Sequence, residues 1–256
     1  MNNPLVSLLM AAYNNAGYIK VAIDSVRCQS YSNWELIIVD DGSTDGTYEL
    51  AVAMALRDTR IKVFRNEVNR GYNFTITEAQ LRASGELLAH FDSDDLLERW
   101  ALDEMVNAFR FRESVKLIYS DFAQIGVHGE HQSYSASLNF DPHKLHQHGW
   151  RHFGMYRASV LDSISGYNEK LFDVPGCSDG DLFMQIAEVF PYEIMRLPKV
   201  LYLYRNHSGN ITKSMQKCDT CTHRQVCNYM RVWAKSANYD PITFTPLEKT
   251  EESKNE

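Results

Sequence analysis

Residues 87–96 have the sequence LLAHFDSDDL, and this stretch decides the fold class. Its first half is an apolar run of strand length, and its second half places three carboxylates within four positions, at Asp92, Asp94 and Asp95. Carboxylates this close raise each other's pKa, and a divalent cation with oxygen ligands removes that cost. We therefore predict that the three acids line a metal-assisted site at the end of a buried strand. The alternative is the acidic first turn of a following helix, whose dipole favours negative charge.

Apolar runs of strand length alternate with segments of helical period through the first half of the chain. Strands are expected at 6–10, 35–39, 61–64, 87–92 and 117–119, and helices at 18–26, 48–55, 74–83 and 102–109. Gly85 is placed to end the third of these helices. The alternation predicts an α/β domain with a mostly parallel sheet and helices on both faces.

Polar clusters directly follow three of the expected strands. They are Tyr13 and Asn14 after the first, Asp40 and Asp41 after the second, and residues 92–95 after the fourth. Ligands of parallel sheets bind beyond the carboxyl ends of the strands, so we expect the clusters to share one site. The chain has neither a Gly-x-Gly-x-x-Gly fingerprint after its first strand nor a P-loop pattern. Since carboxylates hold a diphosphate only through a cation, a nucleoside diphosphate-sugar with Mg²⁺ or Mn²⁺ is favoured.

Several motifs carry a resemblance to a known family. They are VSLLMAAYN at 6–14, ELIIVDDGSTDGT at 35–47, NRG at 69–71, GELLAHFDSDD at 85–95 and SDGDL at 178–182. With them the chain resembles a family 2 glycosyltransferase of the GT-A fold over residues 4–212. The resemblance implies a Rossmann-like nucleotide-diphospho-sugar transferase domain at 1–212, with a donor half at 1–120 and an acceptor half at 121–212.

The resemblance also implies roles for residues on the donor side. Tyr13 would lie against the base and Asp41 would accept a hydrogen bond from the imide N–H of the base. A packed loop aromatic and a helix N-cap are the structural alternatives for these two residues. The residues implied to bind the nucleotide-sugar are Ala11, Tyr13, Asn14, Asp40, Asp41, Arg70, Asp92 and Asp94. The residues implied to hold the metal are Asp94, Asp95 and His207.

The segment 122–153 loses the alternation and contains six histidines. His146, His148 and His152 surround Trp150, but their spacing matches no common zinc pattern, so a polar loop is favoured over a metal site. A short helix is then expected to begin at 156–160.

The run Ser178-Asp179-Gly180-Asp181-Leu182 opens a segment of helical period. The resemblance places Asp179 at the position of the catalytic base, although many relatives have Glu where this chain has Ser178. Asp181 is the substitute candidate, and helix capping is the structural alternative for both acids. A single base that takes the proton of the acceptor hydroxyl, opposite the leaving group, implies displacement with inversion.

A strand-like run at 197–204 ends in Arg205-Asn206-His207. A similar stretch returns to the donor site in the resembled family. There Arg205 would pair with phosphate, and His207 would contact the metal or the diphosphate. An ordinary strand-to-loop transition is the alternative.

The chain continues beyond the resemblance with a cysteine-containing extension at 213–247. Cys218, Cys221 and Cys227 are spaced C-x₂-C-x₅-C, and His223 or Cys177 is a candidate fourth ligand for structural Zn²⁺. Free thiols on a helical hairpin are the alternative. Residues 248–256 are polar and are expected to form a disordered tail.

Composition narrows the partners and the compartment. The net charge of −7 and the lack of a basic block argue against nucleic acid. No apolar run reaches membrane-spanning length, and the start of the chain lacks the basic region of a signal peptide. Five cysteines is an odd number, which argues against a secreted disulfide framework. We expect a cytoplasmic protein, with peripheral membrane contact through a lipid-linked saccharide left open.

These observations predict a metal-dependent inverting glycosyltransferase. It would move a sugar from a nucleoside diphosphate donor, UDP-linked by preference, to a carbohydrate acceptor. The resemblance alone implies a setting in polysaccharide or lipopolysaccharide biosynthesis. One alternative is a sugar-nucleotide nucleotidyltransferase, which needs a glycine-rich basic loop that residues 11–17 do not offer. The other is a non-catalytic nucleotide-sugar-binding protein, against which the intact acidic residues argue.

Overall fold

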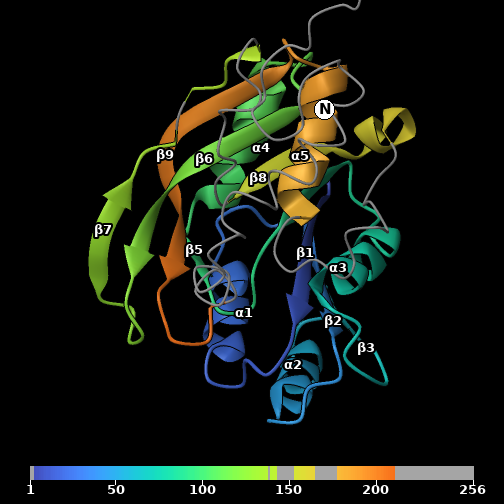
Figure 1. The fold of residues 1–256 in the computed structure, drawn as a ribbon, viewed down its shortest axis with the longest axis vertical. Helices are drawn as coiled ribbons and strands as arrows, with labels where there is room; N and C mark the ends of the chain where they lie inside the picture. The colour runs from blue at the N-terminus through green and yellow to red at the C-terminus, as the bar shows by residue number, and fades with distance from the viewer. Residues whose placement is uncertain (1–2, 138, 143–152, 165–177, 211–256) are drawn as a thin grey trace, which may run out of the picture. The chain divides into compact units, whose positions relative to one another are not determined.

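The computed structural model describes residues 3–137, 139–142, 153–164 and 178–210 (Figure 1). Strands and helices alternate along it, as the sequence predicts. The elements are β1 (Val6–Ala12), α1 (Ile19–Arg27), β2 (Trp34–Asp40), α2 (Thr47–Ala55), β3 (Ile61–Arg65), α3 (Tyr72–Leu81), β4 (Leu87–His90), β5 (Leu96–Leu97), α4 (Ala101–Phe111), β6 (Leu117–Ile125), β7 (His131–Ser135), β8 (Gly154–Arg157), a 3₁₀ helix (Ala158–Ser163), α5 (Ser178–Val189) and β9 (Ile194–Arg205).

The strands of the described residues belong to one sheet with the order β3-β2-β1-β4-β8-β6-β9-β5, and β7 pairs with β6. β3, β2, β1 and β4 are parallel to one another, as expected for the first half of the chain. In the second half, β8 runs antiparallel to both β4 and β6, while β6 and β9 are parallel. The sheet is therefore a regular parallel unit joined to a mixed unit.

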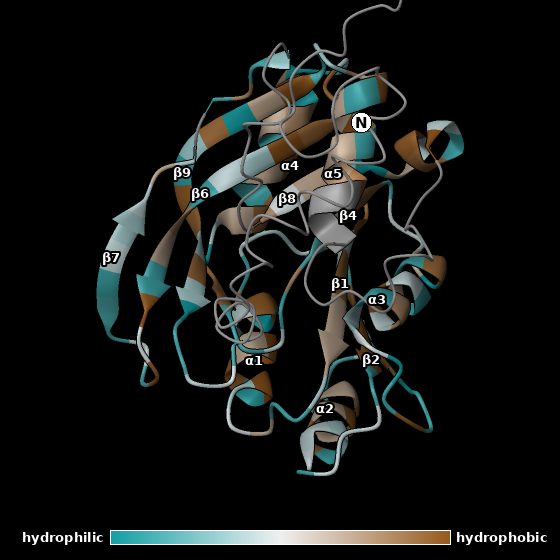
Figure 2. Ribbon diagram, viewed as in Figure 1, coloured by the Kyte–Doolittle hydropathy of each residue, from teal (hydrophilic) through white to brown (hydrophobic). Residues whose placement is uncertain are grey.

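Helices cover both faces of the sheet because side chains alternate along each strand. Leu8 and Met10 of β1 join the core that α1, α2 and α4 contribute to, whereas Leu9 between them joins the core of α3 and α5. Figure 2 shows hydrophobic and polar residues alternating along the helices that cover the sheet. β1 and β2 are buried along nearly their whole length, which explains their unbroken apolar sequence.

The parallel register brings the ends of β1, β2 and β4 to one edge of the sheet. Ala12 pairs with Asp40, and the backbone N–H of Asp41 donates to the Ala12 carbonyl at 2.8 Å. On the other side of β1, the N–H of Phe91 donates to the Leu9 carbonyl at 2.9 Å. The loops that follow these three strands therefore begin side by side, as predicted.

Gly85 does not end a helix as predicted. Helix α3 ends earlier, with Arg82 at its C-cap, and Gly85 is not among the glycines with a positive φ angle. A Cβ on Gly85 would lie 2.6 Å from Ser7 Oγ and 2.7 Å from the Leu5 carbonyl, so this glycine permits close approach to the start of β1. Its N–H donates to Ser7 Oγ at 2.8 Å.

The second half of the chain contains strands that the sequence pattern did not predict. Tyr156 and Arg157, expected to start a short helix, belong to β8, and the helical turn begins only at Ala158. The segment 122–153, expected to lack alternation, contains the end of β6 and all of β7. β8 is short and pairs antiparallel with both β4 and β6, so its conformation depends on neighbours distant in the sequence.

Candidate functional site

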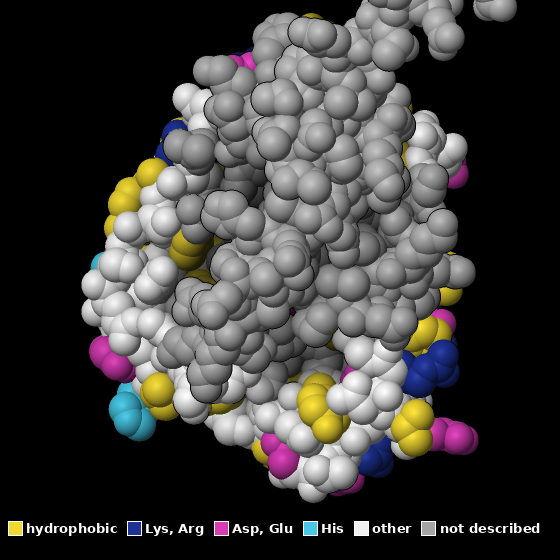
Figure 3. Space-filling model, in the orientation of Figure 1, with side chains coloured by type: hydrophobic (Ala, Val, Ile, Leu, Met, Phe, Trp, Pro, Cys, Tyr) yellow, Lys and Arg dark blue, Asp and Glu magenta, His cyan; other side chains and the backbone are white. Residues whose placement is uncertain are grey.

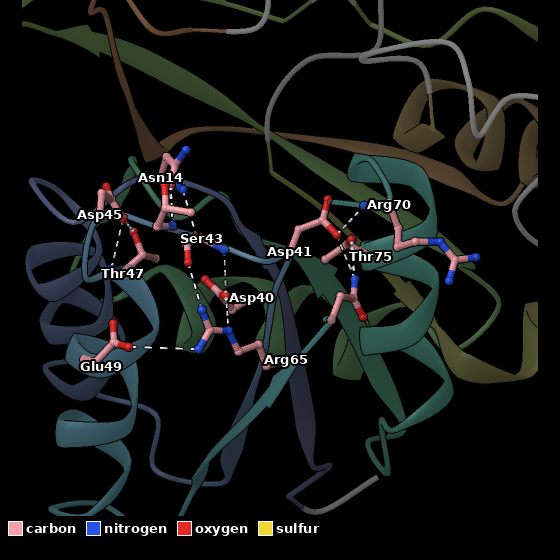
Figure 4. Close-up of polar contacts among 12 residues, drawn as sticks. Asn14, Asp40, Asp41, Ser43, Asp45, Thr47, Glu49, Arg65, Arg70 and Thr75 are labelled. Atoms are coloured by element: carbon pink, nitrogen blue, oxygen red, sulfur yellow. Dashed lines mark hydrogen bonds and ion pairs between the residues drawn. The ribbon is translucent and has the colours of Figure 1, made fainter. Parts of the chain in front are cut away.

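The loops after β1 and β2 are bound to each other by side-chain to backbone hydrogen bonds (Figure 4). The N–H of Asn14 donates to Ser43 Oγ at 2.9 Å, and Asn14 Oδ1 accepts from the N–H of Thr44 at 2.9 Å. Asn14 has a φ angle of +49°, a left-handed conformation that asparagine tolerates better than most residues. Asn14 therefore holds the two loops together by a reciprocal pair of bonds.

Asp41 is buried and holds a third loop against the second. Its Oδ1 accepts from the N–H of Arg70 and from Asn66 Nδ2, both at 2.8 Å, and its Oδ2 accepts from the N–H of Gly71 at 2.8 Å. Asn66 Nδ2 also contacts Thr75 Oγ1 at 3.1 Å. Helix α2 has no side-chain cap, so the N-cap alternative for Asp41 is wrong. A carboxylate offers about four lone-pair positions, so Asp41 keeps capacity for one further donor.

Asp40 is fully buried at the end of β2. Its Oδ1 accepts from the N–H of Ser43 at 3.0 Å and lies 3.4 Å from Arg65 Nε. Arg65 also donates to the Ser43 carbonyl at 2.9 Å. Asp40 and the half-exposed Arg65 thus support the turn that follows β2, with the Asp40 carboxylate turned into the protein (Figure 4).

The other residues predicted on the nucleoside side have different environments. Tyr13 is 46% exposed, so it is not a packed loop aromatic. Ala11 packs against the core beside α3. The Arg70 guanidinium lies 3.9 Å over the Phe74 ring and points away from Asp41 in Figure 4, so Arg70 contributes its backbone N–H to the loop network.

The acids after β4 are held by a strand far away in the sequence. Helix α4 begins only at Ala101, after β5, so the acids do not form the first turn of a helix. Asp92 is partly exposed, with its Oδ2 3.2 Å from the Tyr202 hydroxyl of β9 and its Oδ1 3.4 Å from the Tyr72 hydroxyl. Both contacts are long for O–H···O hydrogen bonds.

Asp95 has a different position from the other acids. It is completely buried, and its two oxygens accept from the backbone N–H of Arg205 and from the Tyr202 hydroxyl, each at 2.6 Å. Burial, together with the charges of Asp94 and Asp92, raises the pKa of Asp95 well above its usual range. Asp95 therefore attaches the acidic loop to the end of β9.

Asp94 and His207 form a pair at the partly open side of the acidic loop. His207 Nε2 lies 2.9 Å from Asp94 Oδ2, and the Asp94 side chain is 18% exposed. The N–H of Gly209 donates to His207 Nδ1 at 3.2 Å, which assigns the ring proton of neutral His207 to Nε2. The Tyr18 ring packs against His207 with the centroids 4.6 Å apart.

Arg205 is buried and ties three segments together through backbone carbonyls. Its guanidinium donates to the carbonyl of Asp94 at 2.8 Å, of Val127 at 2.8 Å and of Gly126 at 3.2 Å. A guanidinium has five N–H donors, so the three bonds to carbonyls leave two donors for the predicted pairing with phosphate.

Asp92 and Asp94 are the residues of the acidic loop that could hold a divalent cation. Both offer partly exposed carboxylate oxygens, the ligand type that Mg²⁺ and Mn²⁺ prefer, whereas both Asp95 oxygens are occupied. For His207 Nε2 to become a ligand, the ring proton would have to move to Nδ1, which accepts here from the N–H of Gly209. Within the described residues, no group of three or more His, Cys, Asp or Glu side chains is arranged to hold a metal. The candidate zinc ligands Cys177, Cys218, Cys221, Cys227 and His223, and the histidines 146, 148 and 152, lie outside the described residues.

Helix α5 begins at Ser178, as predicted, which places Asp179 in its first turn. The side chains of Asp179 and Asp181 lie outside the described part of the chain. Phe183, one helical turn after Asp179, stacks on His90 at a centroid distance of 5.8 Å. His90 ends β4 two residues before Asp92, so α5 packs beside the strand that carries the acids.

Charges on the viewed face of the molecule are interspersed. In Figure 3, the Asp, Glu, Lys and Arg side chains of the described residues lie apart, among uncharged and apolar ones. In the described part of the chain, none of the helices has the length and apolar character to cross a bilayer.

Comparisons with known sequences identify the relatives of this chain. The family model for glycosyl transferase family 2 matches residues 7–165. The proposed glycosyltransferase EpsH of Bacillus subtilis is 30% identical over 236 residues, which cover 85% of this chain and 65% of EpsH. Chondroitin synthase of Escherichia coli is 26% identical over 94% of this chain and 35% of its own length. The chain thus spans less than two thirds of the length of either relative.

Solved structures share the fold. TarS 1–349 of S. aureus in complex with UDP-GlcNAc superposes with a TM-score of 0.68 at 20% identity, covering 90% of this chain and 65% of that one. The mannosyltransferase PcManGT from Pyrobaculum calidifontis, in complex with GDP-Man and Mn²⁺, gives a TM-score of 0.66 at 18% identity, covering 91% and 65%. These structures confirm the predicted α/β architecture of the GT-A type.

Proposed function

This chain belongs to glycosyl transferase family 2, and from that premise we propose that it transfers a sugar from a nucleoside diphosphate donor to a carbohydrate acceptor. The observation that carries the proposal is the convergence of three loops at one sheet edge. Asp41, in the loop after β2, is a buried carboxylate held by three donors, and the acids of the loop after β4 lie across the same edge.

The nucleoside is proposed to bind at the loops after β1 and β2. Tyr13 is exposed there and offers an aromatic face to the base, while the Asp41 carboxylate is fixed in place and keeps room for one more donor. A carboxylate held this rigidly favours a base with an N–H at the matching position. A base with a hydrogen-bond acceptor there would be repelled by the carboxylate and would leave it without a further donor. UDP is the proposed nucleotide, supported by the fold shared with a UDP-GlcNAc complex.

The diphosphate is proposed to lie over the acidic loop with a bound Mn²⁺ or Mg²⁺. Asp92 and Asp94 would hold the cation, with His207 as a further ligand in the tautomer that carries its ring proton on Nδ1. When bound, the cation supplies positive charge that stabilises the departing nucleoside diphosphate. Asp95 is proposed to position the acidic loop and not to contact the cation, because its bonds to Tyr202 and Arg205 hold the loop that carries the other two acids.

Asp179 is proposed as the base that activates the acceptor. An acceptor hydroxyl attacks the anomeric carbon, the bond from that carbon to the diphosphate oxygen breaks, and the hydroxyl proton passes to the carboxylate. Attack opposite the leaving group inverts the anomeric centre. The stacking of α5 on the end of β4 supports this role, because it brings the helix that carries Asp179 beside the acidic loop.

The proposed setting is the synthesis of a polysaccharide, lipopolysaccharide or other surface glycan. It rests on the similarity to EpsH and to chondroitin synthase. A lipid-linked saccharide acceptor would bring the protein to a membrane surface.

The donor site is tested by calorimetric binding of UDP, GDP, CMP and dTDP, each with Mn²⁺, with Mg²⁺ and with EDTA. We expect one nucleotide to bind, and its affinity to fall at least tenfold in EDTA. Asp41→Asn is expected to weaken that nucleotide more than tenfold, while Asp45→Asn, in the same loop but bonded to Ala16 and Thr47, serves as the matched control. No binding of any nucleotide under any condition would contradict the proposed function.

The catalytic assignment is tested separately with Asp179→Asn and Asp181→Asn. We expect Asp179→Asn to retain donor affinity and lose at least a hundredfold in transfer rate, because a general base contributes about 10²–10⁴-fold. Unchanged transfer in Asp179→Asn, with loss in Asp181→Asn, would move the role to Asp181.

A further inference from the structure

Asn15 contacts all three loops that follow the parallel strands β1, β2 and β4. Its own carbonyl accepts from the N–H groups of Tyr18 and Ile19, each at 2.9 Å, which starts helix α1 after the first loop. Its N–H donates to Thr47 Oγ1 at 2.7 Å, at the end of the second loop. Its side-chain amide Nδ2 donates to Ser93 Oγ at 2.7 Å, in the acidic loop.

Ser93 lies between Asp92 and Asp94 and is itself buried, with 2% of its surface exposed. Its hydroxyl therefore points inward to Asn15, while the acids on either side remain partly exposed. The Asn15–Ser93 bond spans 78 positions in the sequence and joins the loops proposed to bind the nucleoside to the loop proposed to bind the diphosphate.

We infer that Asn15 and Ser93 are positioning residues that set the distance between the nucleoside side and the diphosphate side of the donor site. This inference rests on the proposed function. A nucleoside diphosphate spans both sides, so it binds tightly only when the two sides are held at the correct separation before it arrives. A nucleoside alone contacts one side and gains nothing from that separation.

A positioning role and a purely structural role predict different effects on ligand binding. Loss of a structural hydrogen bond lowers stability and weakens every ligand of the folded site to a similar degree. Loss of a positioning bond weakens the ligand that spans both sides and spares the ligand that occupies one. The ratio of the two affinities is therefore the diagnostic quantity.

The experiment measures the dissociation constants of UDP with Mn²⁺ and of uridine, by calorimetry and by competition, for five proteins. These are the wild-type chain, Asn15→Ala, Ser93→Ala, the double variant, and the control Ser25→Ala. Ser25 Oγ accepts from the N–H of Leu97 at 3.2 Å, so the control removes a hydroxyl contact between α1 and the segment just after the acidic loop, away from the proposed ligand. Thermal unfolding of each protein reports its stability.

We expect Asn15→Ala and Ser93→Ala each to lower the affinity for UDP with Mn²⁺ by about three- to tenfold, the range that the loss of one neutral hydrogen bond supports. The affinity for uridine should change by less than about twofold. The double variant should lose no more than the larger single loss, because both substitutions remove the same bond. Ser25→Ala should leave the affinity ratio unchanged even where it lowers the melting temperature.

Equal weakening of UDP and uridine, or losses that add in the double variant, would overturn the inference. Failure of the wild-type chain to bind UDP or any other nucleoside diphosphate would instead overturn the proposed function on which it rests. The two failures are therefore distinguishable from the wild-type measurement alone.

Discussion

Asp41 and Asp95 are both buried carboxylates near the same sheet edge, yet they are supported in opposite ways. Asp41 is held by Asn66, Arg70 and Gly71, which lie 25 to 30 positions away in the sequence. Asp95 is held by Tyr202 and Arg205, which lie 107 and 110 positions away. The nucleoside side is therefore built within the parallel unit, whereas the acidic loop depends on the last strand of the described domain.

The role of each carboxylate follows from the residues that hold it, and not from its position in the sequence motif. Asp41 and its donors belong to a network of short loops that begin at neighbouring strand ends. Asp95 lies nearest the other acids in sequence, but its complete burial gives it an anchoring role that Asp92 and Asp94 do not share. Neighbouring carboxylates in one motif thus have different roles, because both oxygens of Asp95 are bonded to β9 at 2.6 Å, whereas Asp92 contacts Tyr202 at 3.2 Å and Asp94 pairs with His207.

Replacing Gly42 should have the largest effect of these substitutions, because it disrupts the loops proposed to bind the nucleoside. Gly42 has a φ angle of +72°, and a Cβ would lie 2.9 Å from the Val68 carbonyl carbon and 3.0 Å from the Asn69 nitrogen. Gly42→Ala should therefore lower the free energy of unfolding by about 3 kcal/mol and abolish nucleotide binding, because strain and overlap add. Urea unfolding and calorimetry measure the two effects.

Gly46→Ala is the matched control for this prediction. Gly46 also has a positive φ angle, +95°, but a Cβ there would meet nothing within 4 Å. The control should cost only the conformational strain, about 1 kcal/mol. Equal losses in the two variants would show that the contact of Gly42 with Val68 and Asn69 is unimportant.

Tyr202→Phe should break the distant support of the acidic loop. The substitution leaves the buried Asp95 Oδ2 without its 2.6 Å donor, which should cost about 1–3 kcal/mol of stability and weaken the Mn²⁺ dependence of nucleotide binding. Tyr134→Phe is the control, since the Tyr134 hydroxyl also donates to a buried carboxylate, Asp121, that keeps Arg196 as a partner. A larger loss in the control would contradict the anchoring role of Asp95.

Asp121 connects β6 to β9 and gives the mixed unit a dependence on pH. Burial raises its pKa, but hydrogen bonds from Arg196, Tyr134 and Ser137 outweigh this and leave the pKa of Asp121 below its usual value. Its stabilisation is therefore complete above the unfolded-state pKa, near 3.9, and is lost as pH falls through the lower folded-state pKa. Asp121→Asn should show a weaker loss of stability below pH 4, measured by urea unfolding.

Glu35→Gln tests the pH dependence of stability in the parallel unit by the same urea unfolding. Burial raises the pKa of Glu35, but hydrogen bonds from Lys62, Ser7 and Ser84 outweigh it and lower the pKa overall. If the two units unfold together, both variants should flatten the same acid transition. A separate transition for either variant would show that the parallel and mixed units unfold independently.

Arg70→Ala should have the smallest effect and sharpens the account of Asp41. The guanidinium lies on Phe74, while the backbone N–H that Asp41 accepts from survives the substitution. Nucleotide affinity should therefore change by less than about threefold, measured by calorimetry beside Asp41→Asn. A loss greater than tenfold would mean that the Arg70 side chain reaches the ligand.

The parallel unit was predictable because its signals are local. Its strands are buried on both faces and appear as continuous apolar runs, and parallel pairing places their carboxyl ends together. The mixed unit was harder to predict. Tyr156 and Arg157 pair with β4 and β6, and no local pattern distinguishes that short strand from the start of a helix. Gly85 had a local explanation as a helix end, but its role depends on the approach of Ser7, which lies 78 positions earlier in the sequence at the start of the adjacent strand β1.

The sequence by itself determined the fold class, the alternation of strands and helices in the first half, and the sheet edge where the polar clusters meet. These follow from residue type and spacing, which act over a few positions. Only the tertiary structure decided that Asn66 and the backbone of Arg70 hold Asp41, that Asn15 reaches Ser93, and that Asp95 anchors β9. Such contacts join residues 25 to 110 positions apart, and their geometry exists only once the sheet has brought the strand ends together.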